Sequence, residues 1–280
     1  MTDSTSGHRY ENLIDSHFHL AAMQEKGLDC QAILQELDRE GFLGGIDICL
    51  SSSDISASRS LTSVYPGIRH AIGMGPWETG SEEDTDSLIS RLKSLLECNP
   101  DTFSFLGEFG LDYYWKDYGN PSCQIELLEA ELELAAEHDL PVIIHDREAD
   151  SDMEQVLCKH SCPNSGIIHC FSGSRELAFR LLDKGYYISF AGNITYRHSE
   201  DLCEVMRSIP KDRLLLETDS PYLAPIPKRG KPNDPRNMVH TYGFAAEILS
   251  KDVAQLAVEI VDNFNHLLSF CPNHQAGRQI

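Results

Sequence analysis

The chain has 280 residues, 41% of them hydrophobic, which is enough to bury the core of one large domain or two small ones. Its net charge is −21, and a field of that sign argues against tight, sequence-independent binding of duplex nucleic acid through a basic face. No apolar run approaches the roughly 18 residues that span a bilayer, and residues 1–10 form a polar segment without the apolar centre of a secretory signal. We therefore expect a cytoplasmic protein with no membrane partner.

The nine cysteines favour the same compartment. Their number is odd and they are scattered through apolar and helix-like segments, which indicates reduced thiols rather than a disulfide framework. Cys158, Cys162 and Cys170 lie near one another in the sequence but lack the two-residue spacing that is typical of a zinc knuckle. We therefore expect no structural zinc site there.

Short apolar runs alternate with helix-like segments along the chain. The predicted strands are residues 12–19, 45–52, 68–73, 103–107, 141–145, 166–169, 186–190 and 214–217. In segments between them, apolar residues recur at the three- and four-residue spacing of an amphipathic helix. The predicted helices are residues 31–40, 86–96, 124–136, 175–182, 201–206 and 253–268, the last one capped by Asp252.

This alternation predicts an α/β protein, a (β/α)8 TIM barrel in a single domain. Continuous apolar strands are typical of parallel strands that are buried on both faces. The barrel would span residues 11–270, between the polar segment 1–10 and a C-terminal tail at 271–280. A doubly wound open sheet is the alternative, but polar residues end widely separated strands, and only a closed barrel brings those ends together.

Histidines and carboxylates stand at the carboxyl ends of the predicted strands. The first strand carries Asp15-Ser16-His17-Phe18-His19, in which alternate side chains share a face, so that His17 and His19 can bind one metal ion. The histidines and carboxylates that follow the later strands each have an ordinary reading when taken alone, as a rim ion pair, a core histidine or a turn residue. Together they predict a metal centre at the mouth of the barrel. The later strands contribute Glu108, His145, His169 and Asp219.

On these residues the chain resembles the TatD family of metal-dependent hydrolases, within the amidohydrolase-like barrels. The matching strings are DSHFH at 15–19, GEFGLDYY at 107–114, LPVIIHDREA at 140–149, HCFSG at 169–173, YISFAGNITY at 187–196 and ETDSPYLAPIPKRGKPNDP at 217–235. They follow one another in the family's order and cover nearly the whole chain.

The resemblance implies a centre with two divalent metal ions. Glu108 would bridge the ions, and Asp219 would orient a metal-activated water and accept its proton. Such ligands suit zinc, manganese, magnesium or nickel. The first ion would be held by His17, His19 and Asp219, and the second by His145 and His169.

Other matching positions are expected to bind the substrate. Arg147 can present a planar fork to a phosphate. Arg229 and Lys231 add positive charge after the last strand, or belong to a solvated, proline-rich loop held by local ion pairs. The aromatic run at 113–115 can stack on a base or pack against the barrel rim.

One position departs from the family. After the third strand the family reads Gly-x-His-Pro-His, whereas this chain reads Gly73-Met74-Gly75-Pro76-Trp77. Gly75 therefore replaces a histidine that the resemblance places beside the substrate. The predicted metal ligands are untouched, and the substrate side of the site is altered.

These observations predict a deoxyribonuclease that cleaves phosphodiesters at single-stranded or frayed 3′ ends, as a 3′–5′ exonuclease does. A narrow barrel mouth suits a chain end, and bound metal ions supply local positive charge that the acidic surface lacks. One alternative is a hydrolase of a small phosphoester, lactone or amide at the same two metals. Another is a catalytically silent metal-binding protein that acts through protein partners, which the complete ligand set disfavours. No obligate protein partner is predicted.

Overall fold

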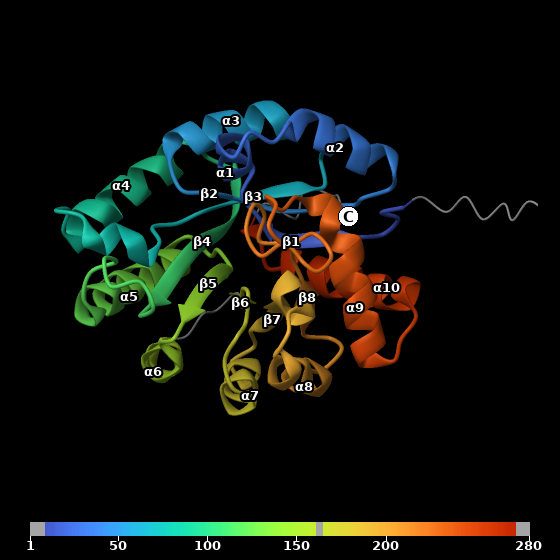
Figure 1. Cartoon of the computed structure of the whole chain (residues 1–280). Coiled ribbons are helices and arrows are strands. Elements are labelled where there is room, and N and C mark those ends of the chain that lie inside the picture. The colour runs from blue at the N-terminus through green and yellow to red at the C-terminus, as the bar shows by residue number, and fades with distance from the viewer. Residues whose placement is uncertain (1–8, 161–164, 273–280) are drawn as a thin grey trace, which may run out of the picture.

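Eight parallel strands run in chain order around the molecule, and the last returns to the first. The computed structural model describes residues 9–160 and 165–272. The strands are β1 (Ile14–Phe18), β2 (Gly44–Cys49), β3 (Ile68–Ile72), β4 (Phe103–Asp112), β5 (Val142–Arg147), β6 (Gly166–Ile168), β7 (Tyr187–Phe190) and β8 (Leu214–Leu216). A bridge between Phe18 and Ser220 joins the two edges of the sheet. The predicted (β/α)8 barrel is confirmed (Figure 1).

Helices connect the strands and lie outside them (Figure 1). They are α1 (Leu20–Glu25), α2 (Cys30–Arg39), α3 (Ser52–Thr62), α4 (Thr85–Cys98), α5 (Pro121–Glu137), α6 (Asp150–Lys159), α7 (Arg175–Asp183), α8 (Glu200–Ser208), α9 (Met238–Leu249) and α10 (Val253–Leu268), with the short 3-10 helices η1 (Pro76–Gly80), η2 (Gly192–Thr195) and η3 (Pro235–Asn237). Asp252 caps α10 as predicted, because its side chain accepts a hydrogen bond from Ala254 N at 2.8 Å. None of the described helices has both the length and the apolar character that a membrane crossing needs.

Four helices occupy segments where none was predicted: α1, α3, α6 and α9. The reason is clearest for α3 and α6, which are rich in serine and acidic residues, so that few apolar positions mark their buried faces. The signal for α3 is its cap, because the Ser51 side chain accepts a hydrogen bond from Asp54 N at 3.2 Å. With six residues, α1 is too short to show a helical period.

The fourth strand is longer than predicted, and this places Glu108 differently. The expectation that the strand ends at residue 107 is wrong, since β4 continues to Asp112. The pairing of β4 with β5 shifts register between Gly107 and Phe109, so Glu108 is the extra residue of a bulge. A bulge kinks a strand and re-aims a side chain. Glu108 therefore lies within the strand rather than after it.

Residues at both predicted domain boundaries pack into the barrel. Tyr10 is buried and its backbone N–H donates to the Glu40 carbonyl at 3.0 Å. Cys271 is buried, and its thiol donates to the Ser104 carbonyl at 3.1 Å. The described cysteines are all free thiols. Residues 1–8 of the predicted polar segment, Cys162 and residues 273–280 lie outside the described residues.

Candidate metal centre

The six predicted metal ligands meet at the carboxyl end of the barrel. Histidines from the neighbourhood of β1, β5 and β6 surround the bulge carboxylate of β4, and the segment after β8 adds an aspartate. Four of the six side chains are buried, while His145 and Asp219 are partly exposed. The six are His17, His19, Glu108, His145, His169 and Asp219.

The two oxygens of Glu108 face different histidine pairs. Oε1 lies 2.8 Å from Nδ1 of His145 and 2.8 Å from Nε2 of His169. Oε2 lies 3.4 Å from Nε2 of His17 and 3.6 Å from Nε2 of His19. One carboxylate therefore stands between two separate pairs of imidazoles.

The histidine nitrogens also face one another within each pair. Nε2 of His17 lies 3.1 Å from Nε2 of His19, and Nδ1 of His145 lies 3.0 Å from Nε2 of His169. Within each pair, donor atoms of the two histidines and of Glu108 lie within 4.8 Å of one another. Imidazole nitrogens and carboxylate oxygens that converge on one space are the donors that zinc and similar ions bind. The residues present therefore fit divalent metal ions.

Asp219 is positioned beside the first histidine pair. Its Oδ1 lies 3.4 Å from Nε2 of His19 and 3.8 Å from Nε2 of His17. Its backbone N–H donates to the His17 carbonyl at 2.9 Å, and its φ of +52° is a left-handed conformation that aspartate tolerates better than most residues. Asp15 accepts hydrogen bonds from the backbone N–H and the hydroxyl of Thr218 at 2.8 and 2.6 Å. Asp15 thus ties β1 to the segment that carries Asp219.

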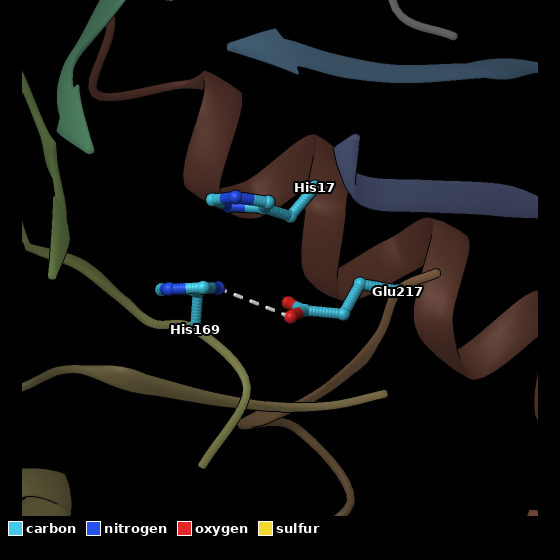
Figure 2. Close-up of side chains that lie close together, drawn as sticks. All are labelled: His17, His169 and Glu217. Carbon is cyan, nitrogen blue, oxygen red and sulfur yellow. Dashed lines mark hydrogen bonds and ion pairs between the residues drawn. The ribbon is translucent and has the colours of Figure 1, made fainter. Parts of the chain in front are cut away.

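Two buried carboxylates that the sequence analysis did not single out hold the second histidine pair. Oδ2 of Asp112 lies 3.2 Å from Nε2 of His145. Oε1 of Glu217 lies 3.2 Å from Nδ1 of His169 (Figure 2). The same oxygen accepts a hydrogen bond from Cys170 N at 2.8 Å. Such partners fix the orientation of a ligating imidazole and raise its basicity. The signal for both was their place inside the matching strings at 107–114 and 217–235.

Figure 2 shows that Glu217 also lies close to His17, whose ring stacks on that of His169. The ring centroids are 4.0 Å apart and the planes differ by 11°. Nδ1 of His17 and Oε2 of Glu217 are buried without a hydrogen-bond partner among the described residues. Glu217 therefore has an oxygen available in the part of the centre where His17 needs an acceptor for its second nitrogen.

The electrostatics favour an ionised Glu108. Burial alone would raise the pKa of Glu108, but the charge of His169 and hydrogen bonds from the surrounding histidines hold it well below the usual value. Burial lowers the pKa of His17. Burial opposes the charge of His169, yet Glu108 and Glu217 raise its pKa well above the usual value. The ionised Glu108 carboxylate therefore places a negative charge at the middle of the centre, where it attracts cations.

The metal centre opens into a cavity of about 730 Å³, which is within the range of about 300–1,000 Å³ that holds small organic ligands. Arg147 lines this cavity, with its guanidinium carbon 4.0 Å from the centre of the Tyr114 ring. Arg229 and Lys231 are exposed in the loop after β8 and are not among the described residues that line the cavity. Arg229 instead stacks 4.0 Å from the centre of the Tyr196 ring.

The three aromatic residues at 113–115 have different surroundings: two contact neighbouring side chains, and the third lines the cavity. The Tyr113 hydroxyl donates to Asp152 at 2.8 Å, which ties the loop after β4 to α6. Tyr114 supports Arg147. Trp115 lines the cavity and is 46% exposed. The packing reading therefore holds for Tyr113 and Tyr114, and stacking of Trp115 on a base stays a prediction.

The model of the family described as TatD related DNase matches residues 14–269, which run from β1 to the end of α10. YcfH of Escherichia coli K12, described as an uncharacterized metal-dependent hydrolase, is 33% identical over 266 residues, which cover 91% of this chain and 95% of that protein. YabD of Bacillus subtilis has the same description and is 31% identical, over 91% of this chain and 98% of that protein.

A solved structure agrees with these matches. The crystal structure of YjjV, a TatD homologue from Escherichia coli, superposes with a TM-score of 0.83 at 29% identity, over 91% of this chain and 97% of that one. The likeness in fold therefore extends over about nine-tenths of the chain. The chain belongs to the TatD-related DNase family of metal-dependent hydrolases.

Proposed function

We propose that this protein is a deoxyribonuclease that hydrolyses phosphodiesters at accessible 3′ ends with two divalent metal ions. The observation that carries the proposal is the position of Glu108, which offers one oxygen to each histidine pair. Two cations about 3.5–4 Å apart need a shared carboxylate of this kind to offset their repulsion. His17, His19 and Asp219 would hold one ion, and His145 and His169 the other.

Bound there, divalent ions would lower the pKa of a water and offset the negative charge of a phosphate. The side chains supply the remaining functions. The Asp219 carboxylate is 13% exposed, compared with 5% for Glu108, and lines the cavity, so it can accept a proton from a water held beside it. Asp112 and Glu217 keep the second histidine pair in place.

The substrate is inferred from shape and charge. The cavity is large enough for one or two nucleotides at a chain end, and its arginine, Arg147, can bind a phosphate by a planar fork. A net charge of −21 disfavours long duplex DNA, which would require many phosphate contacts.

The free thiols of the described cysteines are typical of a reducing compartment, which supports a cytoplasmic location.

Metal analysis combined with hydrolysis assays tests the proposal. The purified protein is stripped, reloaded with zinc, manganese, magnesium or nickel, and assayed on 3′-labelled single strands, frayed duplexes and a panel of small phosphoesters, lactones and amides. We expect two ions per chain and release of nucleotides from 3′ ends. Turnover of small esters alone would overturn the deoxyribonuclease assignment, and failure on every substrate with two ions bound would favour a non-catalytic role.

A further inference from the structure

Trp77 occupies the space that a side chain at position 75 would need. Gly75 has φ −70° and ψ 166°, a conformation that any residue adopts, so the backbone does not require glycine there. A Cβ atom on Gly75 would lie 2.1 Å from Cζ2 of Trp77 and 2.2 Å from Cη2. The missing side chain at 75 is therefore what allows the indole to fold back over the loop after β3. The indole of Trp77 therefore occupies the space beside position 75, where the sequence resemblance predicts a histidine side chain.

The same indole belongs to an aromatic wall of the cavity, which consists of Trp77, Trp115 and Tyr118. The ring of Tyr118 lies 6.1 Å from that of Trp77 and 6.3 Å from that of Trp115. The ring of Trp77 also lies 6.3 Å from that of His145, at an angle of 79°. The wall therefore borders the metal centre directly.

Another aromatic side chain, Tyr222, comes from across the barrel. It follows β8, which is opposite β4 in this strand order, and its ring lies 5.9 Å from that of His19. Tyr222 is 49% exposed and also lines the cavity. Aromatic faces that remain exposed on both sides of a cavity gain free energy when a planar apolar group covers them.

We propose that Trp77 stacks on the terminal nucleobase of the substrate and makes the centre selective for nucleotides that carry a base. This inference rests on the proposed deoxyribonuclease function and adds a specificity residue to it. Arg147 is the one lysine or arginine among the described residues that line the cavity, so basic side chains offer few phosphate contacts there. Stacking on an aromatic side chain strengthens binding by roughly 5- to 150-fold per base, and every base has a face to offer.

Tryptophan fluorescence tests the contact without turnover. The chain has two tryptophans, and both line the cavity. In metal-loaded Trp115→Phe protein Trp77 is the one remaining tryptophan, and with excitation at a wavelength that tyrosine does not absorb we expect dAMP to quench its emission strongly. The matched probe 2-deoxyribose 5-phosphate carries the phosphate and sugar but no base, and we expect it to leave the emission nearly unchanged. Equal quenching by the two probes, or none by either, would overturn the inference.

The reciprocal variant locates the contact. In Trp77→Phe protein Trp115 is the one remaining tryptophan, and under the same excitation we expect weaker quenching by dAMP with little change in affinity, because phenylalanine still stacks. In Trp77→Ala protein we expect the affinity for dAMP to fall about tenfold while that for 2-deoxyribose 5-phosphate stays the same. Unchanged affinity for dAMP in Trp77→Ala would assign stacking to another residue and contradict the proposal.

Hydrolysis separates this inference from the proposed function. We expect the protein to cleave a 3′-terminal nucleotide about tenfold faster, in kcat/KM, than a terminal tetrahydrofuran abasic unit, and Trp77→Ala to abolish the difference. Phe179→Ala, on the outer helix α7, is the matched aromatic control and should keep the preference. Equal cleavage of both ends would refute the role of Trp77 while leaving the deoxyribonuclease intact. Absence of DNA cleavage would refute the proposed function, and the fluorescence result would still decide the stacking contact.

Gly75 provides a second, independent variant. Gly75→Ala adds a Cβ that must displace the indole, so we expect it to lose the base preference although Trp77 is still present. In a Trp77→Ala background the same change meets no ring and should cost almost no thermal stability. Equal losses of stability in both backgrounds would show that the indole does not occupy this space in solution.

Discussion

The two ring nitrogens of His169 face different carboxylates, and Glu217 is the one that faces away from the proposed metal position and orients the ring. Nε2 faces Glu108, whereas Nδ1 lies 3.2 Å from Oε1 of Glu217. In Glu217→Gln the amide oxygen can still accept from Cys170 N, but the negative charge is lost. We expect metal affinity to fall by about 10- to 100-fold, because partners of this kind fix and polarise the ligating ring. Calorimetric metal titration measures it, with Glu176→Gln on the surface of α7 as control. Unchanged affinity would mean that Glu217 only supports the backbone.

Removal of His169 itself should have a larger effect. We expect His169→Ala to bind one metal ion instead of two and to lose most activity, while the barrel persists because the residue follows β6 at the functional end of the barrel. Metal content and circular dichroism measure the two outcomes, and exposed His138 at the end of α5 provides the control variant His138→Ala. Normal metal content and rate in His169→Ala would contradict the two-metal assignment.

Asp219 can be tested with almost no change of shape. Asp219→Asn keeps the size of the side chain but removes its charge and most of its basicity. We expect metal content to stay largely unchanged and turnover to fall by about 100-fold or more, which is typical of the loss of a general base. Single-turnover hydrolysis with equal metal loading measures this. A nearly normal rate would assign Asp219 a purely structural role.

The candidate metal ligands could be found from the sequence, but the carboxylates that orient their imidazole rings could not. His17, Glu108 and Asp219 stand out because histidines and carboxylates recur in or just after several apolar runs, and together they indicate one metal centre although each alone has an ordinary reading. Asp112 and Glu217 matter only through the ring nitrogen that each one faces, and that depends on how two strand ends meet. Trp77 has the same limitation, since its position follows from the space left by Gly75.

At the scale of elements, α5 supports the loop that carries Trp77. Glu131 is fully buried, its Oε1 accepts a hydrogen bond from Met74 N at 2.8 Å, and its Oε2 is buried without a hydrogen-bond partner among the described residues. Burial raises the pKa of Glu131 well above the usual 4.5, although the bond from Met74 opposes this. The structure therefore favours the protonated, neutral carboxyl group.

This shift predicts a loss of stability with rising pH. Because the folded pKa of Glu131 exceeds the unfolded one, its contribution is complete below about pH 4.5 and is lost as the pH rises toward the folded value. Glu131→Gln imitates the neutral form, so we expect its Tm to exceed that of the wild type at about pH 8 and to approach it at about pH 5. Exposed Glu133 on the same helix supplies the control Glu133→Gln. A parallel pH dependence in wild type and Glu131→Gln would contradict this ionisation state.

The elements that were predicted correctly are those with a strong pattern. Apolar runs located all eight strands because strands buried on both faces admit little else. The bulge at Glu108 could not be predicted, since an extra residue in β4 is defined only by its pairing with β5. Helices α3 and α6 pack against the barrel with few apolar residues, so their sequences resemble loops.

At the scale of the whole molecule, charge limits how the protein can hold DNA. The net charge of −21 repels a polyanion at long range, so the proposed DNA binding would rest on short-range contacts at the metal centre and the aromatic wall. Arg147 lies in the cavity, and Arg229 and Lys231 lie in the loop after β8. Few phosphates can therefore be neutralised by side chains.

Affinity for DNA should consequently depend only weakly on salt. The slope of log affinity against log salt is about −0.9 per phosphate contact on duplex and about −0.7 on single strands, so we expect a slope on the order of −1 to −3. The measurement uses Asp219→Asn protein and a short 3′-ended oligonucleotide across a salt series. If the Arg229 guanidinium leaves the Tyr196 ring to contact a phosphate, Arg229→Ala should make the slope shallower by about 0.7, the value of one contact on a single strand. Lys93→Ala, on the outer helix α4, is the control and should leave the slope unchanged. A steep slope would show that DNA binds to a basic surface outside the cavity, and it would move the binding site away from the barrel mouth.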